Sequence, residues 1–235
     1  KDNIFGNMIN QKIFVPLFFA IYLLAGSSLV ADYGIAFDED MQRSMGQNRI
    51  DYIINFLSKI FPTINNDYNQ NIKVEYPEYG ALFEVTALWI DKMFNFPDTR
   101  SQFFLRHYLI FFTSFIGSIF FYFLSLKRFN SWKIALFGTL LLVSSPRIFA
   151  ASFYNSKDII FMYFFIINTF FAIIFLEKPN YSNAIFFALA SALSVSIRVA
   201  GVLVPFLTLF FLFIKFLRKD YLLNILKYFL TFLIF

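Results

Sequence analysis

The sequence contains no cysteine and a single histidine among its 235 residues. The lack of cysteine excludes disulfide scaffolds, thiolate metal sites and thiol nucleophiles, and one histidine excludes a histidine-rich metal centre. Charge is also scarce, since only 15% of the residues are Asp, Glu, Lys or Arg. With 59% hydrophobic residues, among them 38 Phe, the chain cannot cover itself with polar surface as a soluble domain does. The composition therefore predicts a protein of the lipid bilayer.

Long apolar runs recur along the whole chain. A helix that crosses the hydrocarbon core of a bilayer needs roughly 20 residues. The first run is longer than the apolar core of a signal peptide and lacks a cleavage pattern, so it predicts an anchor. We expect an all-α, polytopic membrane protein forming one module over residues 1–235, with six complete transmembrane helices and a truncated seventh. These runs cover residues 13–31, 104–126, 134–151, 159–176, 184–196 (continuing toward 199), 202–216 and 228–235.

Basic residues are concentrated in the short gaps between these runs. The gaps that carry them all fall on one side of the membrane, which the positive-inside rule assigns to the cytoplasm. Residues 32–102, residues 147–158 and the turn near Arg198 then lie on the outer side. Because topology explains the net charge of +5 and no continuous basic stripe occurs, we expect no nucleic-acid partner. The basic residues in question are Lys12, Lys127, Arg128, Lys133, Lys178, Lys215, Arg218, Lys219 and Lys227.

The first outer loop, residues 32–102, contains two further helical patterns. From Met41 onward, isoleucine and leucine recur at helical spacing between charged residues, which predicts an amphipathic helix on the membrane surface. An Asn-rich stretch between Pro62 and Pro77 predicts a turn. Pro77 suits the first turn of a second interfacial helix that continues through residues 78–94.

Ionisable side chains occur at four places on the outer side. Such groups are costly at membrane depth, so they tend to face a cavity, find partners and serve a function. Each place also has an ordinary explanation, because acids cap helix starts and basic side chains anchor helices at the interface. The four places are the acids Asp38, Glu39 and Asp40; the pair Arg106 and His107; the segment containing Arg147, Asn155, Lys157 and Asp158; and Arg198.

All four places are predicted to lie on the same side of the membrane, which favours one cavity that they share. The cations could hold a lipid-linked phosphate and stabilise the charge that grows on it as it leaves. A carboxylate could orient and deprotonate an attacking hydroxyl or amine. The pattern therefore favours a site for a lipid phosphate and a second, nucleophilic substrate.

Four motifs in this order carry a resemblance to a known family. They are GIAFDED after the first span, EYGALFE in the first loop, SPRIFAASFYNSKD, and SIRVAGVL. Together they resemble the GT-C membrane glycosyltransferases that use polyprenyl-phosphate sugars, particularly relatives of the protein O-mannosyltransferases and of the aminoarabinose transferase that modifies lipid A. The resemblance extends from Ile13 to about Pro205.

The resemblance implies inverting transfer of a sugar from a polyprenyl-phosphate donor to a protein, lipid or glycan acceptor. It implies that Asp38 is the catalytic base, that Glu39 supports or replaces it, and that Asp158 is a second acid of the site. Arg147, Lys157 and Arg198, with Arg106 and Asn155, are the expected phosphate-binding residues. Some relatives bind a divalent cation near these acids, so a metal stays an open expectation. The active face would be periplasmic, in a bacterial inner membrane.

Members of this family usually have more spans, and the sequence begins with Lys1, so we expect an N-terminal portion. Two other functions stay open. A transporter or lipid flippase would be expected to show repeated halves with Gly- or Pro-interrupted helices near the midplane. A noncatalytic assembly subunit would use its acids only for capping and solvation, and Asp38 would then be dispensable.

Overall fold

The computed structural model describes residues 2–61, 80–96 and 98–217, and these residues form helices without a β-strand. The predicted all-α class is confirmed for them. The expected turn between Pro62 and Pro77 and the truncated seventh span lie outside the described residues. In chain order the elements are α1 (Asp2–Leu29), η1 (Val30–Asp32), α2 (Glu39–Ile60), α3 (Leu82–Phe94), α4 (Thr99–Phe129), α5 (Trp132–Ser144), α6 (Pro146–Tyr154), α7 (Asp158–Glu177), α8 (Tyr181–Ile197), η2 (Val199–Val202) and α9 (Leu203–Leu217).

Three of the described helices are long and apolar enough to cross a membrane, and their number rises to four if the bent pair α5–α6 counts as one span. The three are Asn10–Asp32, Thr99–Phe129 and Asp158–Glu177. The apolar helices Tyr181–Ile197 and Val199–Lys215 are shorter. An integral membrane protein is therefore supported by length and composition, with three or four spans in the described residues where the sequence predicted six.

The predicted span over residues 134–151 is not one straight helix, because the chain bends by 65° between α5 and α6. Pro146 causes the break. A proline has no N–H to continue the helix, and it forces the preceding residue out of the helical region. Ser145 accordingly has φ −59° and ψ 120°, and Pro146 becomes the first residue of α6.

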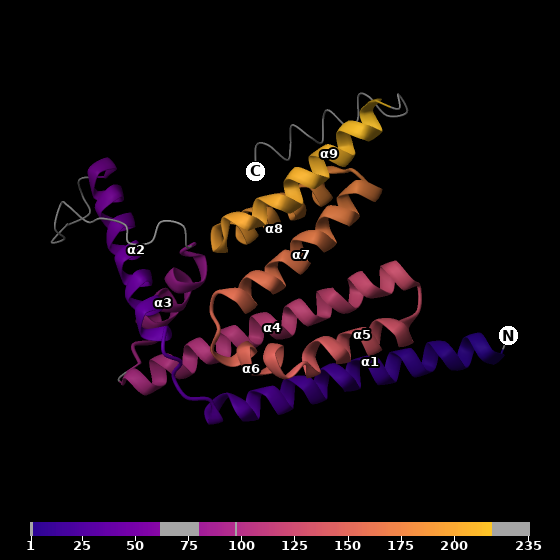
Figure 1. The fold of residues 1–235 in the computed structure, drawn as a ribbon, viewed down its shortest axis with the longest axis horizontal. Helices are drawn as coiled ribbons and strands as arrows, with labels where there is room; N and C mark the ends of the chain where they lie inside the picture. The colour runs from indigo at the N-terminus through magenta and orange to yellow at the C-terminus, as the bar shows by residue number, and fades with distance from the viewer. Residues whose placement is uncertain (1, 62–79, 97, 218–235) are drawn as a thin grey trace.

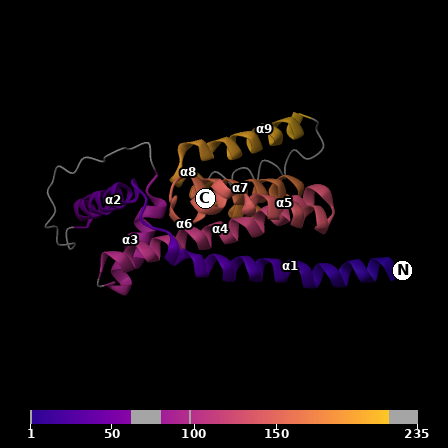
Figure 2. The ribbon, with the colours of Figure 1, turned by 60° about the horizontal axis from the view of Figure 1, so that its bottom comes forward.

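Helix α4 is the central element of the bundle. It contacts α1, α3, α5, α6 and α7, while α8 and α9 pack on the other side of α7. Figure 2 shows the resulting layers, with α1 and α9 on opposite outer sides of α4 and α7. Gly117 permits the close approach of α4 and α7, since a Cβ atom there would lie 2.3 Å from the ring of Tyr163.

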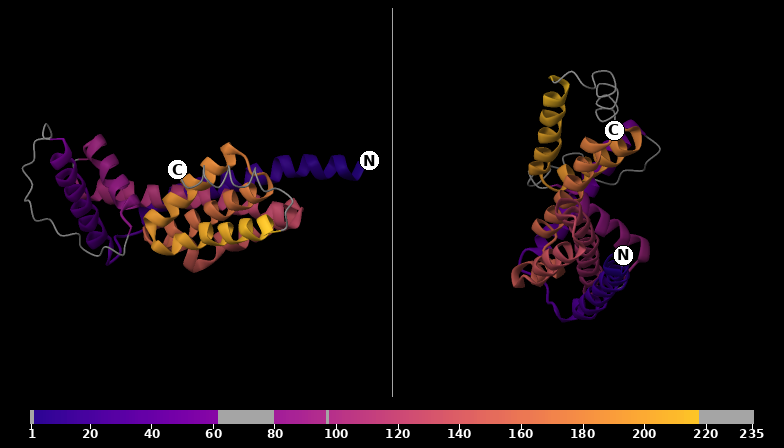
Figure 3. Two further views of the ribbon diagram at one scale, coloured as in Figure 1. Left: turned by 90° about the horizontal axis from the view of Figure 1, so that it is seen from above. Right: turned by 90° about the vertical axis from the view of Figure 1, so that its right-hand side faces the viewer.

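The two predicted loop helices exist as α2 and α3. They pack against each other at the end of the bundle away from the N-terminus, and α2 runs across the direction of α1 and α4 (Figures 1 and 3). Large apolar side chains on the second half of α2 stay exposed, as expected for a helix at a membrane interface. They are Tyr52, Ile53, Phe56, Leu57 and Ile60.

Helix α3 begins at Leu82, four residues later than the predicted start at residue 78, and Pro77 itself lies outside the described residues. Gly80 shows why the helix starts late. Its N–H donates to the carbonyl of Ile197 at 3.1 Å, and a Cβ atom there would lie 1.9 Å from the carbonyl oxygen of Ser196. This contact holds the approach to α3 in a non-helical conformation against the end of α8.

Candidate functional site

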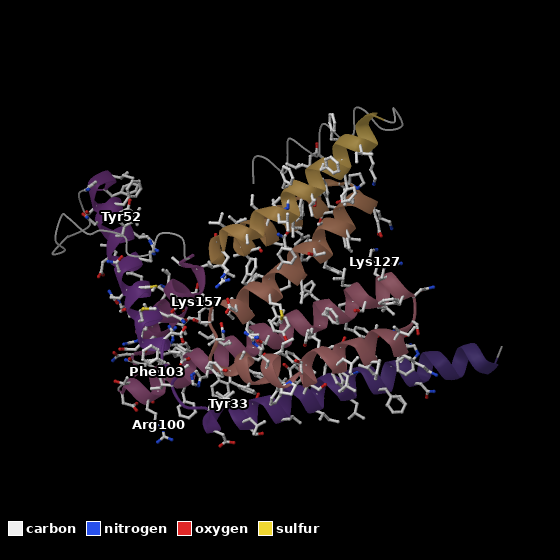
Figure 4. The ribbon with its side chains drawn as sticks, viewed as in Figure 1. Tyr33, Tyr52, Arg100, Phe103, Lys127 and Lys157 are labelled. Atoms are coloured by element: carbon white, nitrogen blue, oxygen red, sulfur yellow. The ribbon has the colours of Figure 1, made fainter. Side chains whose placement is uncertain are left out.

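A polar cluster joins α2, α3, α4 and the connection between α6 and α7 at one end of the bundle. The start of α2 lies over α4, and the connection between α6 and α7 meets both loop helices there. Figure 4 shows Lys157, Arg100 and Tyr33 toward this end, whereas Lys127 lies at the opposite end. Lys127 forms an ion pair there with Glu177. Lys127, from one of the short basic gaps, therefore lies at the end of the bundle opposite the polar cluster.

Glu39 and His107 form a fully buried pair. The His107 Nε2 atom lies 2.9 Å from Oε1 and 3.2 Å from Oε2 of Glu39, and the two side chains are 3% and 0% exposed. The backbone N–H of Ala36 also donates to Glu39 Oε2, at 2.8 Å. Because buried charges need partners, this arrangement fixes the first turn of α2 on α4. The Glu39 carboxylate is therefore already engaged by hydrogen-bond partners inside the protein.

Asp38, the predicted base, has a different environment from Glu39. It directly precedes α2 and is exposed, and its Oδ2 accepts a hydrogen bond from the side-chain amide of Gln42. Asp40 is exposed in the first turn of α2, where an acid is favourable beside the helix N-terminus. Of the three acids in this row, Asp38 is thus the solvent-accessible carboxylate that also contacts the buried network.

Gln42 connects Asp38 to a second buried ion pair. Arg106 Nη2 lies 2.6 Å from Glu84 Oε2, and both residues are buried. The hydroxyl of Ser156 donates to Glu84 Oε1 at 2.7 Å and also contacts Gln42 Oε1. Arg106 keeps two buried nitrogens, Nε and Nη1, without a hydrogen-bond partner among the described residues. The network therefore retains unused donor capacity next to Glu84.

The sequence interpretation missed Glu84, Gln42 and Ser156. A signal existed for Glu84, because Glu84, Ala87, Leu88 and Asp91 share one helical face, and all four are buried. An acid on such a face requires a partner. Gln42 and Ser156 give no comparable signal, since neutral polar residues are common at helix starts and in loops.

The remaining predicted site residues lie in α6, at the start of α7 and at the end of α8. Asp158 Oδ1 lies 2.6 Å from Arg198 Nη2, and their side chains are 62% and 37% exposed. Asn155 Oδ1 accepts the N–H groups of Lys157 and Asp158 at 3.1 and 2.7 Å, so its side chain stabilises the start of α7. Arg147 lies exposed in the first turn of α6 and has no polar partner among the described residues.

Two clefts that share lining residues lie beside the network, and a further cleft of about 500 Å³ is lined by His107 and Arg100. The polar cleft holds only about 20 Å³, which is room for roughly one water molecule. A larger occupant therefore requires side chains at its rim to move. It is lined by Gln42, Met45, Gly46, Arg49, Gly80, Ala81, Phe83, Glu84, Ser156, Lys157 and Ile197.

The apolar cleft lies between α3, α4, α7 and α8 and has a volume of about 260 Å³. It shares Phe83 and Ile197 with the polar cleft. A polar compartment thus adjoins an apolar one. The apolar cleft is lined by Leu82, Phe83, Thr86, Ala87, Leu109, Thr113, Phe164, Leu193 and Ile197.

The acids do not assemble into a metal centre in the part of the chain that the structure describes. No group of three or more His, Asp or Glu side chains there could hold a metal ion. Glu39 and Glu84 are each engaged by a basic side chain and by a further donor. These described residues therefore do not provide a set of ligands for the divalent cation considered above. Comparisons of the chain with protein families, with curated proteins and with solved structures find no match.

Proposed function

We propose that this chain is part of a membrane glycosyltransferase that uses a sugar linked to a polyprenyl phosphate. The sugar would pass with inversion to a protein, lipid or glycan acceptor on the extracytoplasmic face. The observation that carries the proposal is the adjoining pair of clefts, one polar and one apolar, beside an accessible carboxylate. An amphiphilic lipid phosphate has the same division into a charged head and an apolar tail.

The apolar cleft suits the first isoprene units of the donor. Its walls come mainly from apolar side chains of four helices, and it shares Phe83 and Ile197 with the polar cleft. Burying apolar surface stabilises the bound state by about 25 cal/mol per Å². The tail would supply affinity in this way, while the polar cleft selects the head group.

The phosphate would lie near Lys157, at the start of α7. Lys157 lines the polar cleft, and Arg198 is held close to the start of α7 by its ion pair with Asp158. Arg106 lies deeper, with two nitrogens available for hydrogen bonds. Cations in a site sheltered from water stabilise the negative charge that develops on a departing phosphate. Arg147 would contribute only if the donor reaches the first turn of α6.

Asp38 would act as the general base. The nucleophilic oxygen or nitrogen of the acceptor attacks the anomeric carbon as its proton passes to the Asp38 carboxylate. The bond between the anomeric carbon and the phosphate oxygen breaks, and the polyprenyl phosphate leaves with the electron pair. Attack from the face opposite the leaving group accounts for inversion. Asp158 would hold Arg198, and Glu39 would position Asp38 through its buried contact with His107.

The membrane setting is part of the same proposal. The fold would be of the GT-C type, with the two shorter apolar helices α8 and α9 and the bent pair α5–α6 counted among its spans. The basic end of the bundle would face the cytoplasm by the positive-inside rule. The end that carries α2 and α3 would face the periplasm of a bacterial inner membrane.

The test measures transfer of a radiolabelled sugar from polyprenyl phosphate by the full-length gene product in proteoliposomes. General base catalysis contributes typically 10²–10⁴-fold, so Asp38→Asn is expected to lower the rate by about that factor. Asp40→Asn is the matched control, because Asp40 is an exposed neighbouring acid without a contact to the network. Equal rates in wild type and in a folded Asp38→Asn variant would refute the assignment of the base.

One observation favours a transporter as the second candidate. The bend of 65° between α5 and α6 produces a Pro-interrupted helix pair, a feature that the sequence alone did not reveal. Broken helices in transporters expose backbone groups to a substrate at membrane depth. Movement of a labelled lipid phosphate across the proteoliposome membrane without consumption of the sugar donor would favour this function over glycosyl transfer.

A further inference from the structure

A separate cleft lies between α1 and α4 at the basic end of the bundle. It has a volume of about 530 Å³ and is lined by residues of two long apolar helices. Its polar residues are Gln11, Lys12 and Tyr122, and the amide of Gln11 donates to the Tyr122 hydroxyl at 3.4 Å. Its apolar residues are Val15, Pro16, Phe19, Ile119 and Phe123. We call it the basic-end cleft.

Lys12 provides a positive charge at this cleft. It is exposed and forms no ion pair with a carboxylate of the described residues. Lys127 and Arg128 occupy the last turn of α4 at the same end, but Lys127 is paired with Glu177 and neither residue lines the cleft. An anion at the mouth of the cleft would therefore be attracted by Lys12, the basic residue that lines it.

Pro16 adds a hydrogen-bond acceptor to the same place. It lies inside α1 and has no N–H, so the carbonyl of Lys12, four residues earlier, loses its helical donor. A backbone carbonyl that lacks this donor can accept a hydrogen bond from another group. Lys12 therefore presents a cation from its side chain and a backbone carbonyl that lacks its usual helical donor.

We propose that the basic-end cleft binds an anionic phospholipid whose head group carries hydroxyl groups, such as phosphatidylglycerol. The phosphate pairs with Lys12 and accepts a hydrogen bond from Gln11, and a glycerol hydroxyl donates to the Lys12 carbonyl. The acyl chain lies along Phe19, Ile119 and Phe123. The lipid binds at the opposite end of the bundle from the proposed transfer site and does not depend on that function.

The apolar walls distinguish a lipid from free phosphate as the ligand. Inorganic phosphate would use Lys12 and Gln11 but leave the walls formed by Val15, Phe19, Ile119 and Phe123 uncovered. A phospholipid covers them and satisfies the polar mouth at once. The charge on Lys12 favours an anionic head group over phosphatidylcholine, which has no net charge.

The test is native mass spectrometry of the chain released from micelles that contain phosphatidylglycerol or phosphatidylcholine with matched acyl chains. One basic residue near a membrane surface is worth about 1 kcal/mol, which corresponds to roughly a fivefold change in affinity. We expect phosphatidylglycerol to be retained about fivefold better, and Lys12→Gln to abolish this preference. Arg128→Gln is the matched control, since it removes a charge at the same end outside the cleft.

Two more variants separate the parts of the proposal. Ile119→Trp fills the cleft and should lower retention of both lipids, whereas Pro16→Ala restores the missing N–H and should lower retention of phosphatidylglycerol relative to phosphatidic acid. Circular dichroism verifies that each variant folds. An equal loss of preference in Lys12→Gln and Arg128→Gln would overturn the proposal. Displacement of the bound lipid by millimolar inorganic phosphate would also overturn it and identify a simple phosphate site.

Discussion

The carboxylate of Glu39 and the imidazole of His107 meet across 68 positions of sequence, at 2.9 Å and out of contact with solvent. This pair attaches the start of the first loop helix to the central helix α4. Asp38 is the residue before Glu39, so its position depends on the pair. The contact thus relates a buried structural element to the exposed carboxylate of the proposed reaction.

Removing the Glu39 carboxylate should loosen the start of α2. In Glu39→Ala, His107 and the N–H of Ala36 lose their common acceptor, and an unsatisfied buried group costs about 1–3 kcal/mol. We expect faster hydrogen exchange in residues 33–46 and a lower free energy of unfolding in micelles. Asp40→Ala, at the exposed neighbour, should change stability by less than about 0.5 kcal/mol. Unchanged exchange in Glu39→Ala would contradict the anchoring role.

Removing one partner of the ion pair between Glu84 and Arg106 should destabilise the protein more than removing both. Glu84→Leu leaves the Arg106 charge buried without its partner, which typically costs about 3–5 kcal/mol. The double variant Glu84→Leu with Arg106→Leu should recover much of that stability, because two apolar side chains replace the pair. Urea titration of detergent-solubilised protein measures both. A double variant less stable than Glu84→Leu alone would refute this account.

The helical class and the two loop helices were predictable because they follow from periodicity. Apolar residues in long runs or at helical spacing specify helices locally, and the structure places α1, α2, α4 and α7 close to the expected ranges. The bend before Pro146 was also encoded locally, but the length of the apolar run concealed it. The late start of α3 depends on contact between Gly80 and the distant α8, which no local pattern contains.

The candidate site was only partly predictable, because its contacts depend on how the helices pack. The acids and cations of the motifs could be found because charges are rare in apolar surroundings, and the bundle brings Asp158 to Arg198 and Glu39 to His107. Which acid is buried depends on helix packing, so Glu39 and Asp38 could not be distinguished from the sequence. The neutral links Gln42 and Ser156 could not be recognised at all before their partners were placed.

Replacing Arg198 should weaken binding of the polyprenyl-phosphate donor and have little effect on the stability of the protein. Its ion pair with Asp158 is substantially exposed, and exposed pairs contribute about 0–1 kcal/mol. If Arg198 contacts the phosphate, Arg198→Ala should weaken donor binding about tenfold, which corresponds to roughly 1.4 kcal/mol. Binding of a polyprenyl phosphate in proteoliposomes measures the effect. Lys127→Ala removes an ion pair at the opposite end and serves as the control, with donor affinity expected to stay unchanged.

Packing of α4 against α7 should depend on the absence of a side chain at position 117. In Gly117→Ala the new Cβ would lie 2.3–2.5 Å from ring and Cβ atoms of the fully buried Tyr163, which cannot turn away without disturbing its own packing. Overpacking of this kind costs about 1–3 kcal/mol, and small residues are the usual device for close helix contacts in membranes. Gly138→Ala is the matched control on α5, because its Cβ would meet Phe121 only at 3.9 Å. There the change should be neutral or slightly stabilising, since alanine favours a helix more than glycine does. Thermal unfolding of both variants in the same detergent measures the difference in stability. Equal unfolding midpoints would contradict the prediction, because they would show that a side chain at position 117 does not destabilise the contact between α4 and α7.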